Sequence, residues 1–442
     1  MNMFSETDST DNHVIDIAVI GGGASGMAAA IFAQRTFTET CRKSGNVTIF
    51  ERNDRVGKKL LMTGNGRCNL TNLDTDLYHY HGNAVGFAKG ALLRYPPEKV
   101  MSFFTELGVV FTVEESQKVY PMSLSAASVL DSLRLSMIEL GIQVKTGSKV
   151  IGIKRDGKEF IVSLADNSSF RALSVIAAAG GMCAPSTGSD GNGYRLLSAF
   201  AHRLLSPVPS IVQIKTDTKF CKPLSGNKIL GSASLFIDGK KVREEAGEIL
   251  FTDYGLSGPP ILQLSGYVSR EMAGISGQGT EGNIYISLDF LPDYSLDEVH
   301  TMMIMRKTAF PDRKLEDYLT GLFHKRLALG ILRKATDKPM SAVTATLSDK
   351  DIDKLASACK VMKIPVTGTM TFANAQTTAG GIDTSDFDPS TLASVKCPGL
   401  FACGEILDID GDCGGFNLQW AWSSGFLSGS SAAKYVIKER NL

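Results

Sequence analysis

The spacing of apolar and polar positions near the start of the chain predicts a strand, a helix and a second strand. Ile15–Ile20 and Val47–Phe50 are short apolar runs, as expected for strands buried in a parallel sheet. Between them, residues 25–36 are small and apolar at helical spacing. This order makes a βαβ unit, in which the two strands lie parallel and the helix covers the sheet. The pattern therefore predicts an α/β fold.

The next part of the chain alternates between helical and strand patterns. It predicts three helices and, between the second and the third, a meander of three short strands. The helices are expected over 97–107, 125–140 and 190–200, and the meander over 148–178.

The middle of the chain changes character twice. From 206 to about 290, β-type segments alternate with glycine turns, and Asp238-Gly239 is a hairpin signal. We expect a small β-barrel or sandwich there. Residues 295–362 have helical spacing and predict a small helical bundle. β-type sequence returns over 365–380 and would complete the barrel.

The last segment repeats the arrangement of the first. A short apolar strand over 399–402 runs into a loop rich in glycine and acidic residues over 408–417. A final helix is predicted from Leu418 to about residue 438. A helix that begins at the end of a core strand is a natural site for an anion.

Three glycines follow the first strand in a G-x-G-x-x-G pattern. They are Gly21, Gly23 and Gly26, with Ala24 and Ser25 between them. The first glycine permits a tight turn, the second lets a diphosphate approach the backbone, and the third lets the helix pack on the strand. The helix N-terminus then offers free N–H groups and a positive dipole end to the phosphates. A second copy of the pattern, Gly277, Gly279 and Gly282, precedes a strand and is not interpreted as such a site.

Glu51 stands at the end of the second strand, where a βαβ unit of this kind hydrogen-bonds a ribose hydroxyl. The alternative is a surface acid at a strand end. Arg52, next to it, is included in the predicted cofactor site.

The irregular segment 57–72, GKKLLMTGNGRCNLTN, is too rich in glycine for a helix or a strand. Loops of this kind on an α/β scaffold usually carry function. Its predicted cofactor-binding residues are Lys58, Lys59, Gly66, Arg67 and Asn69. Cys68, within the loop, is interpreted as a small buried thiol rather than a reactive one.

Glycine-rich junctions at both ends of the chain indicate one long ligand. A dinucleotide would place its diphosphate at the first junction and its second ring system near the last. If that ring were a flavin, the dipole of the final helix would favour negative charge on the reduced ring. This favours FAD over NAD as the resident cofactor. Paired glycines after the meander, beginning at Gly180, suggest a further close approach to the ligand.

Composition narrows the class of protein. Lys plus Arg and Asp plus Glu both number 46, so the formal net charge is zero, which argues against a nucleic-acid partner. The polar N-terminus has no signal-peptide pattern, and no apolar run approaches the roughly 20 residues that span a bilayer. The eight cysteines form no C-x-x-C motif or zinc spacing, so no metal is expected and the thiols are predicted to be free in a reducing compartment. We expect a cytoplasmic protein.

Several motifs together resemble one family. GGGASG with Glu51, GKKLLMTGNGRCNLTN, AAGG, GEILFTDYGLSGPPIL and GEILDIDGDCGGFNLQWAWSSG occur in order over about 14–435. They are similar to those of the bacterial BaiN/RdsA-type NAD(P)/FAD-dependent oxidoreductases, which include bile-acid Δ4,6-reductase-like flavoproteins. The resemblance implies a two-part Rossmann-like FAD-binding domain interrupted by a β-barrel domain and a small helical domain. Cys413 departs from the pattern, where Thr is commoner.

The resemblance also implies roles for individual residues. The diphosphate would lie on the first glycine motif and the ribose on Glu51, with Lys59 and Asn69 near the cofactor. Val150 would give backbone contacts to adenine. The residues bordering the flavin and its ribityl chain would come from the last junction: Gly404, Glu405, Asp410, Gly415, Phe416, Asn417 and Leu418.

The domain boundaries follow from these patterns. We predict a disordered tail, an FAD-binding domain in two parts, a β-barrel domain, a helical domain and a return through the barrel. In chain order these are 1–13, 14–207, 208–292, 293–364, 365–380 and 381–442, the second and the last being the two parts of the FAD-binding domain.

The predicted activity is an NAD(P)H-driven reduction of a C=C bond in an enone-like substrate, such as a steroid or bile acid, by hydride transfer from flavin N5. NAD(P)H would dock transiently, because no second dinucleotide motif with the right context is visible. The alternatives are a flavin dehydrogenase or oxidase of another small molecule, and a flavoprotein factor that acts with a partner, for example in RNA modification. The expected partner is a small-molecule substrate, with no nucleic acid and no membrane, and the protein is expected to be a monomer or homodimer.

The proton donor is not identified by the sequence. Arg67, Tyr254 and Asp410 are candidates. His79 and His81, in YHYH, are interpreted as surface or capping residues.

Overall fold

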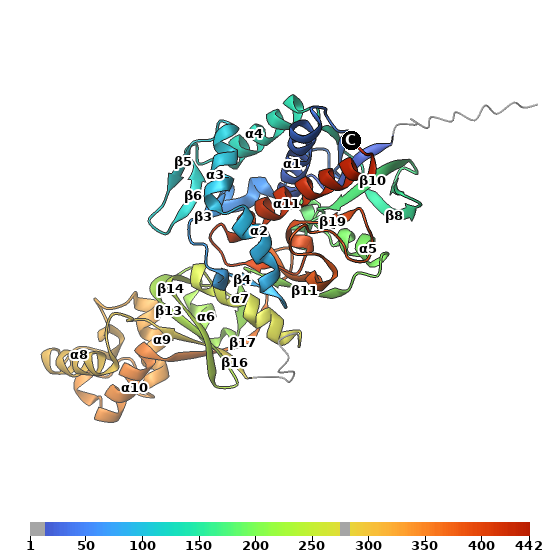
Figure 1. Cartoon of the computed structure of the whole chain (residues 1–442). Coiled ribbons are helices and arrows are strands. Elements are labelled where there is room, and N and C mark those ends of the chain that lie inside the picture. The colour runs from blue at the N-terminus through green and yellow to red at the C-terminus, as the bar shows by residue number, and fades with distance from the viewer. Residues whose placement is uncertain (1–13, 275–282) are drawn as a thin grey trace, which may run out of the picture. The chain divides into compact units, whose positions relative to one another are not determined.

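The computed structural model describes residues 14–274 and 283–442, which form two compact units (Figure 1). Unit 1 contains residues up to Pro207 together with Thr377–Leu442, and unit 2 is Val208–Gln376. The predicted tail over 1–13 and the second glycine pattern at 277–282 lie outside the described residues. Each unit is described by itself.

A mostly parallel sheet forms the centre of unit 1. Its strands are β1 (Ile15–Ile20), β2 (Val47–Phe50), β7 (Gln143–Lys145), β8 (Val150–Asp156), β9 (Glu159–Leu164), β10 (Ser169–Ala177) and β19 (Leu400–Ala402). Within the described residues their order is β7-β2-β1-β10-β9-β8, and β19 pairs in parallel with β10. The antiparallel pairs β8–β9 and β9–β10 confirm the predicted meander.

The parallel strands end together at one edge of this sheet. Ile20 on β1 lies opposite Phe50 on β2 and Ala177 on β10. The residues that follow, including Gly21 and Glu51, therefore gather at this edge. Open α/β sheets bind their ligands outside the carboxyl ends of such strands.

The remaining elements of unit 1 surround the sheet. Its helices are α1 (Ala24–Cys41), α2 (Ala88–Arg94), α3 (Pro97–Glu106), α4 (Ala126–Glu139), α5 (Asn192–Ser198) and α11 (Phe416–Glu439). Short strands are β3 (Thr71–Asn72), β4 (Tyr80–His81), β5 (Phe111–Val113), β6 (Lys118–Pro121), β11 (Leu204–Ser210), β18 (Thr377–Ile382) and β20 (Asp410–Gly411). The 3₁₀ segments include η1 (Leu60–Gly66), η3 (Val85–Phe87) and η9 (Gly404–Ile406). α1 extends beyond its predicted end at 36, and α11 begins before its predicted start at Leu418.

Helices α1 and α11 lie side by side, although they stand at opposite ends of the chain (Figure 1). Small residues let their backbones approach closely. A Cβ atom on Gly425 would lie 2.6 Å from the Ser25 carbonyl oxygen, and one on Gly429 would lie 2.1 Å from the Ala29 carbonyl oxygen. At these contacts the residue numbers increase in the same direction along both helices, so the two helices run parallel. Close packing fixes how far α11 is shifted along α1.

A closed antiparallel barrel forms one part of unit 2, which confirms the predicted barrel. Its strands are β12 (Ile214–Thr216), β13 (Lys228–Ile237), β14 (Lys240–Phe251), β15 (Gly255–Ser257), β16 (Ile284–Asp289) and β17 (Met362–Thr369). Within the described residues they close in the order β12-β15-β14-β13-β16-β17. β17 completes the barrel after the helical segment, as expected.

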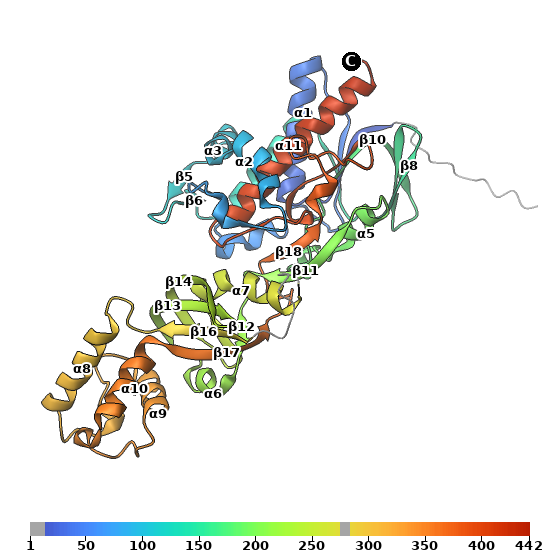
Figure 2. The same ribbon diagram turned by 60° about the horizontal axis from the view of Figure 1, so that its bottom comes forward.

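The helices of unit 2 are α6 (Thr218–Cys221), α7 (Pro259–Met272), α8 (Leu296–Ala309), α9 (Lys325–Ala335) and α10 (Asp349–Lys360). Figure 2 shows α8, α9 and α10 gathered at one end of this unit. Their apolar residues share a core cluster with the barrel strands.

Helix α7 corrects the prediction that the whole stretch from 206 to 290 is β-type. Pro259 and Pro260 occupy the first turn, where proline is compatible with a helix. Ile261, Leu264 and Val268 are buried at helical spacing and pack on the barrel. Because the glycines that flank the segment are turn residues, the helical spacing between them was not recognised in the sequence.

The helical spacing predicted over 295–362 is interrupted before α9. Residues 315–317 form only a 3₁₀ turn, and α9 begins at Lys325. Gly321 has a φ of +89°, a left-handed conformation that interrupts a helix. His324 caps α9 by accepting a hydrogen bond from the Arg326 amide.

Candidate functional site

Two kinds of glycine form the first junction, between β1 and α1. Gly21 and Gly26 are packed against the chain itself. A Cβ on Gly21 would lie 2.5 Å from the Ala178 carbonyl oxygen, and one on Gly26 would lie 1.9 Å from the Gly21 carbonyl oxygen. Gly23 differs, because a Cβ there would meet no atom of the described residues within 4 Å, its two chain neighbours apart. The space beside Gly23 is open to a group from outside the chain.

Gly23 is also the N-cap of α1. Its backbone is extended, with φ −80° and ψ −172°, and the cap has no side-chain hydrogen bond. Met27 makes the first helical hydrogen bond, to the Gly23 carbonyl oxygen. The N–H groups of Ala24, Ser25 and Gly26 therefore belong to the first turn, where a helix offers its donors to an anion.

Glu51 is buried at the end of β2 and is held by three hydrogen bonds. Its Oε2 accepts from the Gly22 amide at 2.9 Å, and its Oε1 accepts from the amide and the side chain of Asn53 at 2.8 and 2.7 Å. A carboxylate offers about four acceptor positions. One remains on Oε2, beside the glycine turn, for a hydroxyl group.

Arg52 and Val150 are both engaged by the segment around α5. Arg52 forms an ion pair with Asp190 at 2.5 Å, and the Val150 carbonyl oxygen accepts from the Asn192 side chain at 2.9 Å. Burial opposes the charge of Asp190, but its hydrogen bonds from Arg52 and the Asn192 amide outweigh this and lower its pKa. Both contacts thus lead to the turn at the start of α5, through Asp190 and Asn192.

Two further predicted glycines stand at the ends of β10 and β19. Gly180 has a φ of +73°, and a Cβ there would lie 2.9 Å from the Ser189 hydroxyl oxygen. Gly404 has a φ of +77°, and its Cβ would lie 2.4 Å from the Ser25 hydroxyl oxygen. The Gly404 amide donates to the Ser424 hydroxyl at 2.9 Å. These contacts bring the loop after β19 against the start of α1.

An ion pair joins the segment 57–72 to the loop after β19. Lys59 Nζ lies 2.5 Å from Glu405 Oε2, and Glu405 Oε1 accepts from the Thr378 amide at 2.9 Å. Lys58 instead pairs with the exposed Asp54. Of the two predicted lysines, only Lys59 is therefore directed toward the second junction.

The rest of this segment is more ordered than expected, because it contains η1 and β3. η1 is kinked and ends at Gly66, whose φ is +83°. The Arg67 guanidinium lies 4.5 Å from the Tyr120 ring centroid and pairs with Glu114 at 3.3 Å. Arg67 is thus engaged by the small sheet of β3, β5 and β6.

Asn69 presents a buried acceptor to the start of α11. Its side chain is 8% exposed, and its Oδ1 has no hydrogen-bond partner among the described residues. A Cβ on Gly415 would lie 3.0 Å from this oxygen. Thr71 donates to the Gln419 side chain at 2.5 Å, which fastens the segment to α11. A buried amide oxygen without a partner is costly, so it suits a donor from a bound group.

The second junction is the N-terminus of α11. Gly415 is its N-cap, with a φ of +107°. The Asn417 side chain accepts from the Gly411 amide at 2.8 Å and donates to its carbonyl oxygen at 2.7 Å, so it holds the loop closed. The Phe416 side chain is buried, and Leu418 is partly buried. These side chains shape the junction, and the backbone N–H groups of its first turn are left for an anion.

His79 and His81 were missed by the sequence analysis, and their interpretation as surface or capping residues is wrong. His79 Nδ1 lies 3.0 Å from Asp412 Oδ2, and its Nε2 lies 2.9 Å from Asp74 Oδ2. His81 Nε2 lies 2.8 Å from Asp412 Oδ1. The His79 ring also stacks on Phe416 with centroids 4.2 Å apart. The only linear signal was the repeated histidine itself, since Asp412 is more than 300 residues away.

The three candidate proton donors lie in different places. Asp410 is completely buried on β20, opposite His81 on β4. Arg67 is engaged as described above, and Tyr254 stands in the turn between β14 and β15 of unit 2. Of the three, Asp410 is the candidate at the second junction.

The two junctions are separated by a defined distance. Ser25, at the start of α1, contacts Gly425, which is nine residues after the first residue of α11, Phe416. At 1.5 Å per residue the N-terminus of α11 therefore extends about 14 Å beyond the start of α1, on its N-terminal side. A single phosphate cannot serve both helices. An elongated dinucleotide such as FAD fits the residues present: an open space at Gly23, an acceptor on Glu51, and the partnerless Asn69 oxygen at the far end.

None of the eight cysteines, all of which lie in the described residues, forms a disulfide, as predicted. Burial raises the pKa of Cys68 to about 12 and that of Cys403 to about 11, and burial also raises the pKa of Cys413. Cys41, at the end of α1, is partly exposed.

We therefore expect Cys41 to be the thiol that iodoacetamide labels in the native protein at about pH 8, since thiolates are the reacting species. Peptide mapping by mass spectrometry checks this. Cys41→Ser should remove the label, whereas rapid labelling of Cys68 would contradict the placement of the segment 57–72.

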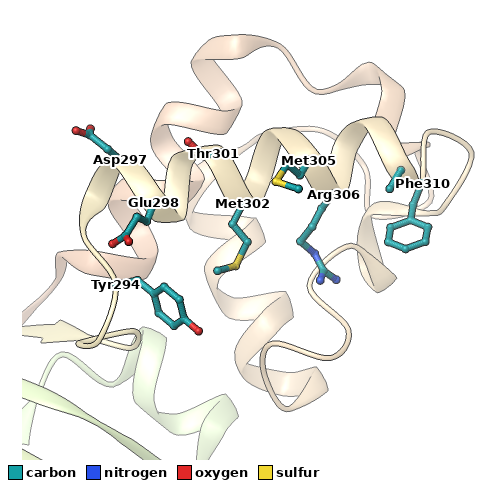
Figure 3. Close-up of a pocket in the computed structure, with 9 residues that line it drawn as sticks. Tyr294, Asp297, Glu298, Thr301, Met302, Met305, Arg306 and Phe310 are labelled. Atoms are coloured by element: carbon teal, nitrogen blue, oxygen red, sulfur yellow. The ribbon is translucent and has the colours of Figure 1, made fainter.

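A hollow of about 660 Å³ lies along α8 in unit 2. Tyr294, Met302 and Arg306 point toward one side of α8 in Figure 3. None of the predicted cofactor-binding residues lines it. In the part of the chain that is described, no helix is long and apolar enough to cross a bilayer. Among the same residues, no group of three or more His, Cys, Asp and Glu is arranged to hold a metal ion.

Comparison with known proteins identifies the family. The model of the HI0933-like protein Rossmann domain matches residues 15–431. A 3-dehydro-bile acid delta(4,6)-reductase of Clostridium scindens is 35% identical over 418 residues, which are 95% of this chain and 99% of that protein. A ribosomal RNA dihydrouridine synthase of Haemophilus influenzae is 28% identical over 422 residues, 94% of this chain and 98% of that protein.

Among solved structures, a 3-ketosteroid-delta4-(5alpha)-dehydrogenase from Rhodococcus jostii RHA1 aligns with 97% of this chain and 99% of its own. The identity is 13% and the TM-score is 0.46. The family match over nearly the whole chain confirms the resemblance found in its motifs and the α/β class with an inserted barrel. The chain belongs to the HI0933-like (BaiN/RdsA) family of FAD-dependent oxidoreductases.

Proposed function

We propose that this protein is an NAD(P)H-driven reductase of a C=C bond conjugated to a carbonyl group. The observation that carries the proposal is the pair of parallel helix N-termini, offset by about 14 Å, each opening from a glycine junction. This arrangement suits FAD, with its diphosphate at α1 and its ring end at α11. A steroid or bile-acid enone is the proposed substrate class, because the C. scindens relative acts on a 3-dehydro-bile acid.

The roles of the residues follow from their contacts. The first turn of α1 and the open face of Gly23 would receive the diphosphate, and the remaining acceptor position of Glu51 would receive a ribose hydroxyl. At the other end, the first turn of α11 would stabilise negative charge, and the Asn69 oxygen would accept a hydrogen bond. Bound FAD would supply the hydride chemistry.

Lys59 and Val150 complete the proposed cofactor site. Lys59, fixed by Glu405, would place a positive charge between the two junctions. Val150, at the start of β8, would line the adenine end through its backbone, next to the turn that holds Arg52. NAD(P)H would act as a transient electron donor rather than a resident cofactor.

A second candidate function is the reduction of uridine in RNA. It is favoured by the H. influenzae relative, a ribosomal RNA dihydrouridine synthase that matches nearly the whole chain. Its chemistry is related, since the bond reduced in uridine is also conjugated to a carbonyl group. The equal numbers of basic and acidic residues count against this candidate, because RNA binding relies on basic surfaces.

One experiment separates the two candidates. The purified holoprotein is incubated without oxygen with NADH or NADPH and either a 3-oxo-Δ4,6 bile acid or uridine-containing ribosomal RNA. We expect the bile acid, and not the RNA, to gain hydrogen by mass spectrometry in step with NAD(P)H oxidation. The matched control is the same 3-oxo bile acid without the double bonds, which should leave NAD(P)H unchanged.

The other outcomes are equally informative. Dihydrouridine in the RNA without reduction of the enone would replace the first function by the second. A purified protein that is colourless and takes up no FAD would overturn both.

A further inference from the structure

The buried carboxylate of Asp412 connects two histidines to the start of α11. Its side chain is 2% exposed, and its two oxygens face different histidines: Oδ2 faces His79 and Oδ1 faces His81. An ionised carboxylate only accepts hydrogen bonds, so the histidine nitrogens donate. A buried carboxylate is tolerated when its oxygens are satisfied in this way.

Backbone hydrogen bonds connect the same two segments of the chain. The Asp412 amide donates to the His79 carbonyl oxygen at 2.8 Å, and β4 pairs with β20 beside it. The segment 77–83 thus contacts the loop 408–417 and supports it. Asp408 extends the contact at the other end by accepting from the Asn83 amide at 2.8 Å.

His79 also contacts α11 directly. Its ring stacks on Phe416, the first residue of that helix, with an angle of 15° between the rings. Its second nitrogen, Nε2, lies 2.9 Å from Asp74 Oδ2. Both nitrogens of His79 therefore face carboxylates, and the ring is held from both sides. The backbone amide of Asp76, and then His79, lower the pKa of Asp74, which keeps that carboxylate ionised.

We propose that His79 and His81 are positioning residues for the flavin end of the site, acting through Asp412. They hold the loop 408–417 so that the first-turn N–H groups of α11 and the Asn69 oxygen face the same bound group. This inference rests on the proposed function, because it assumes that FAD binds at the two junctions. It assigns neither histidine a proton-transfer step.

The geometry of the hydrogen bonds selects the variants that test it. His81 uses Nε2, and glutamine places an N–H at a similar position, so His81→Gln keeps the bond to Asp412. His81→Met has a similar size and loses it. His79 uses Nδ1 toward Asp412, so His79→Asn keeps that bond, whereas His79→Phe keeps only the stacking on Phe416.

The measurements are the Kd for FAD, by titration of the apoprotein, and the visible spectrum of the bound flavin. Neither requires substrate or turnover. We expect His81→Met and His79→Phe to raise the Kd by about tenfold or more, since a hydrogen bond to a charged group is lost. Both should also shift the spectrum. His81→Gln and His79→Asn should stay within about threefold of the parent.

A matched control comes from unit 2. His300 on α8 pairs with Asp353 at 3.0 Å, and His300→Gln should leave the Kd and the spectrum unchanged. Far-ultraviolet circular dichroism of each apoprotein shows whether it is folded. If His81→Met fails to fold, Asp412→Asn, which keeps the side-chain size, takes its place.

The outcomes distinguish the inference from the proposed function. If the parent binds FAD and the two disruptive variants bind it equally well with the same spectrum, the histidines do not position the site. If the conservative variants fail as badly as the disruptive ones while remaining folded, the bonds to Asp412 are not what matters, and the inference is overturned. If the parent binds no FAD, the proposed function fails first.

Discussion

Replacing Gly23 with Asp is expected to raise the Kd for FAD about a thousandfold while leaving the apoprotein as stable as the parent, or slightly more stable. Gly23 is the N-cap of α1 in an extended conformation that any residue adopts, and apart from its two chain neighbours no atom of the described residues lies within 4 Å of its missing Cβ. Asp is a preferred N-cap and its charge suits the helix dipole, so the apoprotein should gain a few tenths of a kcal/mol.

The bound state is affected in the opposite direction. The new carboxylate would stand where the diphosphate is proposed to lie. Two like charges about 4 Å apart repel by about 4 kcal/mol at an effective dielectric constant of about 20. This corresponds to roughly a thousandfold increase in Kd. The measurement is titration of the apoprotein with FAD, followed by flavin absorbance after gel filtration.

Gly23→Asn is the matched control for charge. It has the size of Asp and also caps a helix well, but it is neutral. We expect it to weaken FAD binding less than Gly23→Asp by at least about tenfold, because only the steric part of the effect remains. Equal binding by the parent and both variants would remove the diphosphate from this junction.

The first junction illustrates what the sequence could predict. β1 and β2 were expected at their observed bounds, because a buried parallel strand is a continuous apolar run and glycine ends it. The glycine spacing reflects local needs that a motif records: Gly21 and Gly26 are constrained by backbone atoms a few residues away or on the neighbouring strand. Glu51 was likewise placed by its position at a strand end.

What the sequence did not predict depends on contacts between distant residues. The bond from His79 to Asp412 spans 333 positions, and neither residue type in isolation indicates the other. Similarly, the sequence did not predict that the Phe416 ring stacks on His79 or that the Asn417 side chain holds the loop closed. Helix α7 was missed for a local reason, since glycines that belong to turns flank its helical period.

The parallel crossing of α1 and α11 connects the two parts of the site. Residues 14–207 carry the first junction and Thr377–Leu442 carry the second, so their distance depends on how α11 rests on α1. Gly425 and Gly429 set this contact, because both face backbone atoms of α1. Backbone atoms cannot move away as a flexible side chain can, so this contact between the two helices tolerates little added side-chain volume.

Gly429→Ala is accordingly expected to destabilise unit 1 by about 3 kcal/mol, at the upper end for overpacking, because its Cβ would lie 2.1 Å from the Ala29 carbonyl oxygen. Both tryptophans of the protein, Trp420 and Trp422, are on α11, so the denaturant midpoint followed by tryptophan fluorescence reports on this unit. Affinity for FAD should fall as well, since separating the helices moves the two junctions apart.

Gly86→Ala provides the comparison for this effect. Gly86 lies in η3 of the same unit, and within the described part of the chain a Cβ there would meet no atom within 4 Å other than those of its chain neighbours. We expect its midpoint to stay the same or to rise slightly, because alanine restricts the unfolded chain. If Gly429→Ala also kept the parent midpoint while FAD affinity was unchanged, the close crossing would not set the distance between the junctions. If it lowered the midpoint but left FAD affinity intact, the close packing of the two helices would matter for stability alone and not for the distance between the two binding ends.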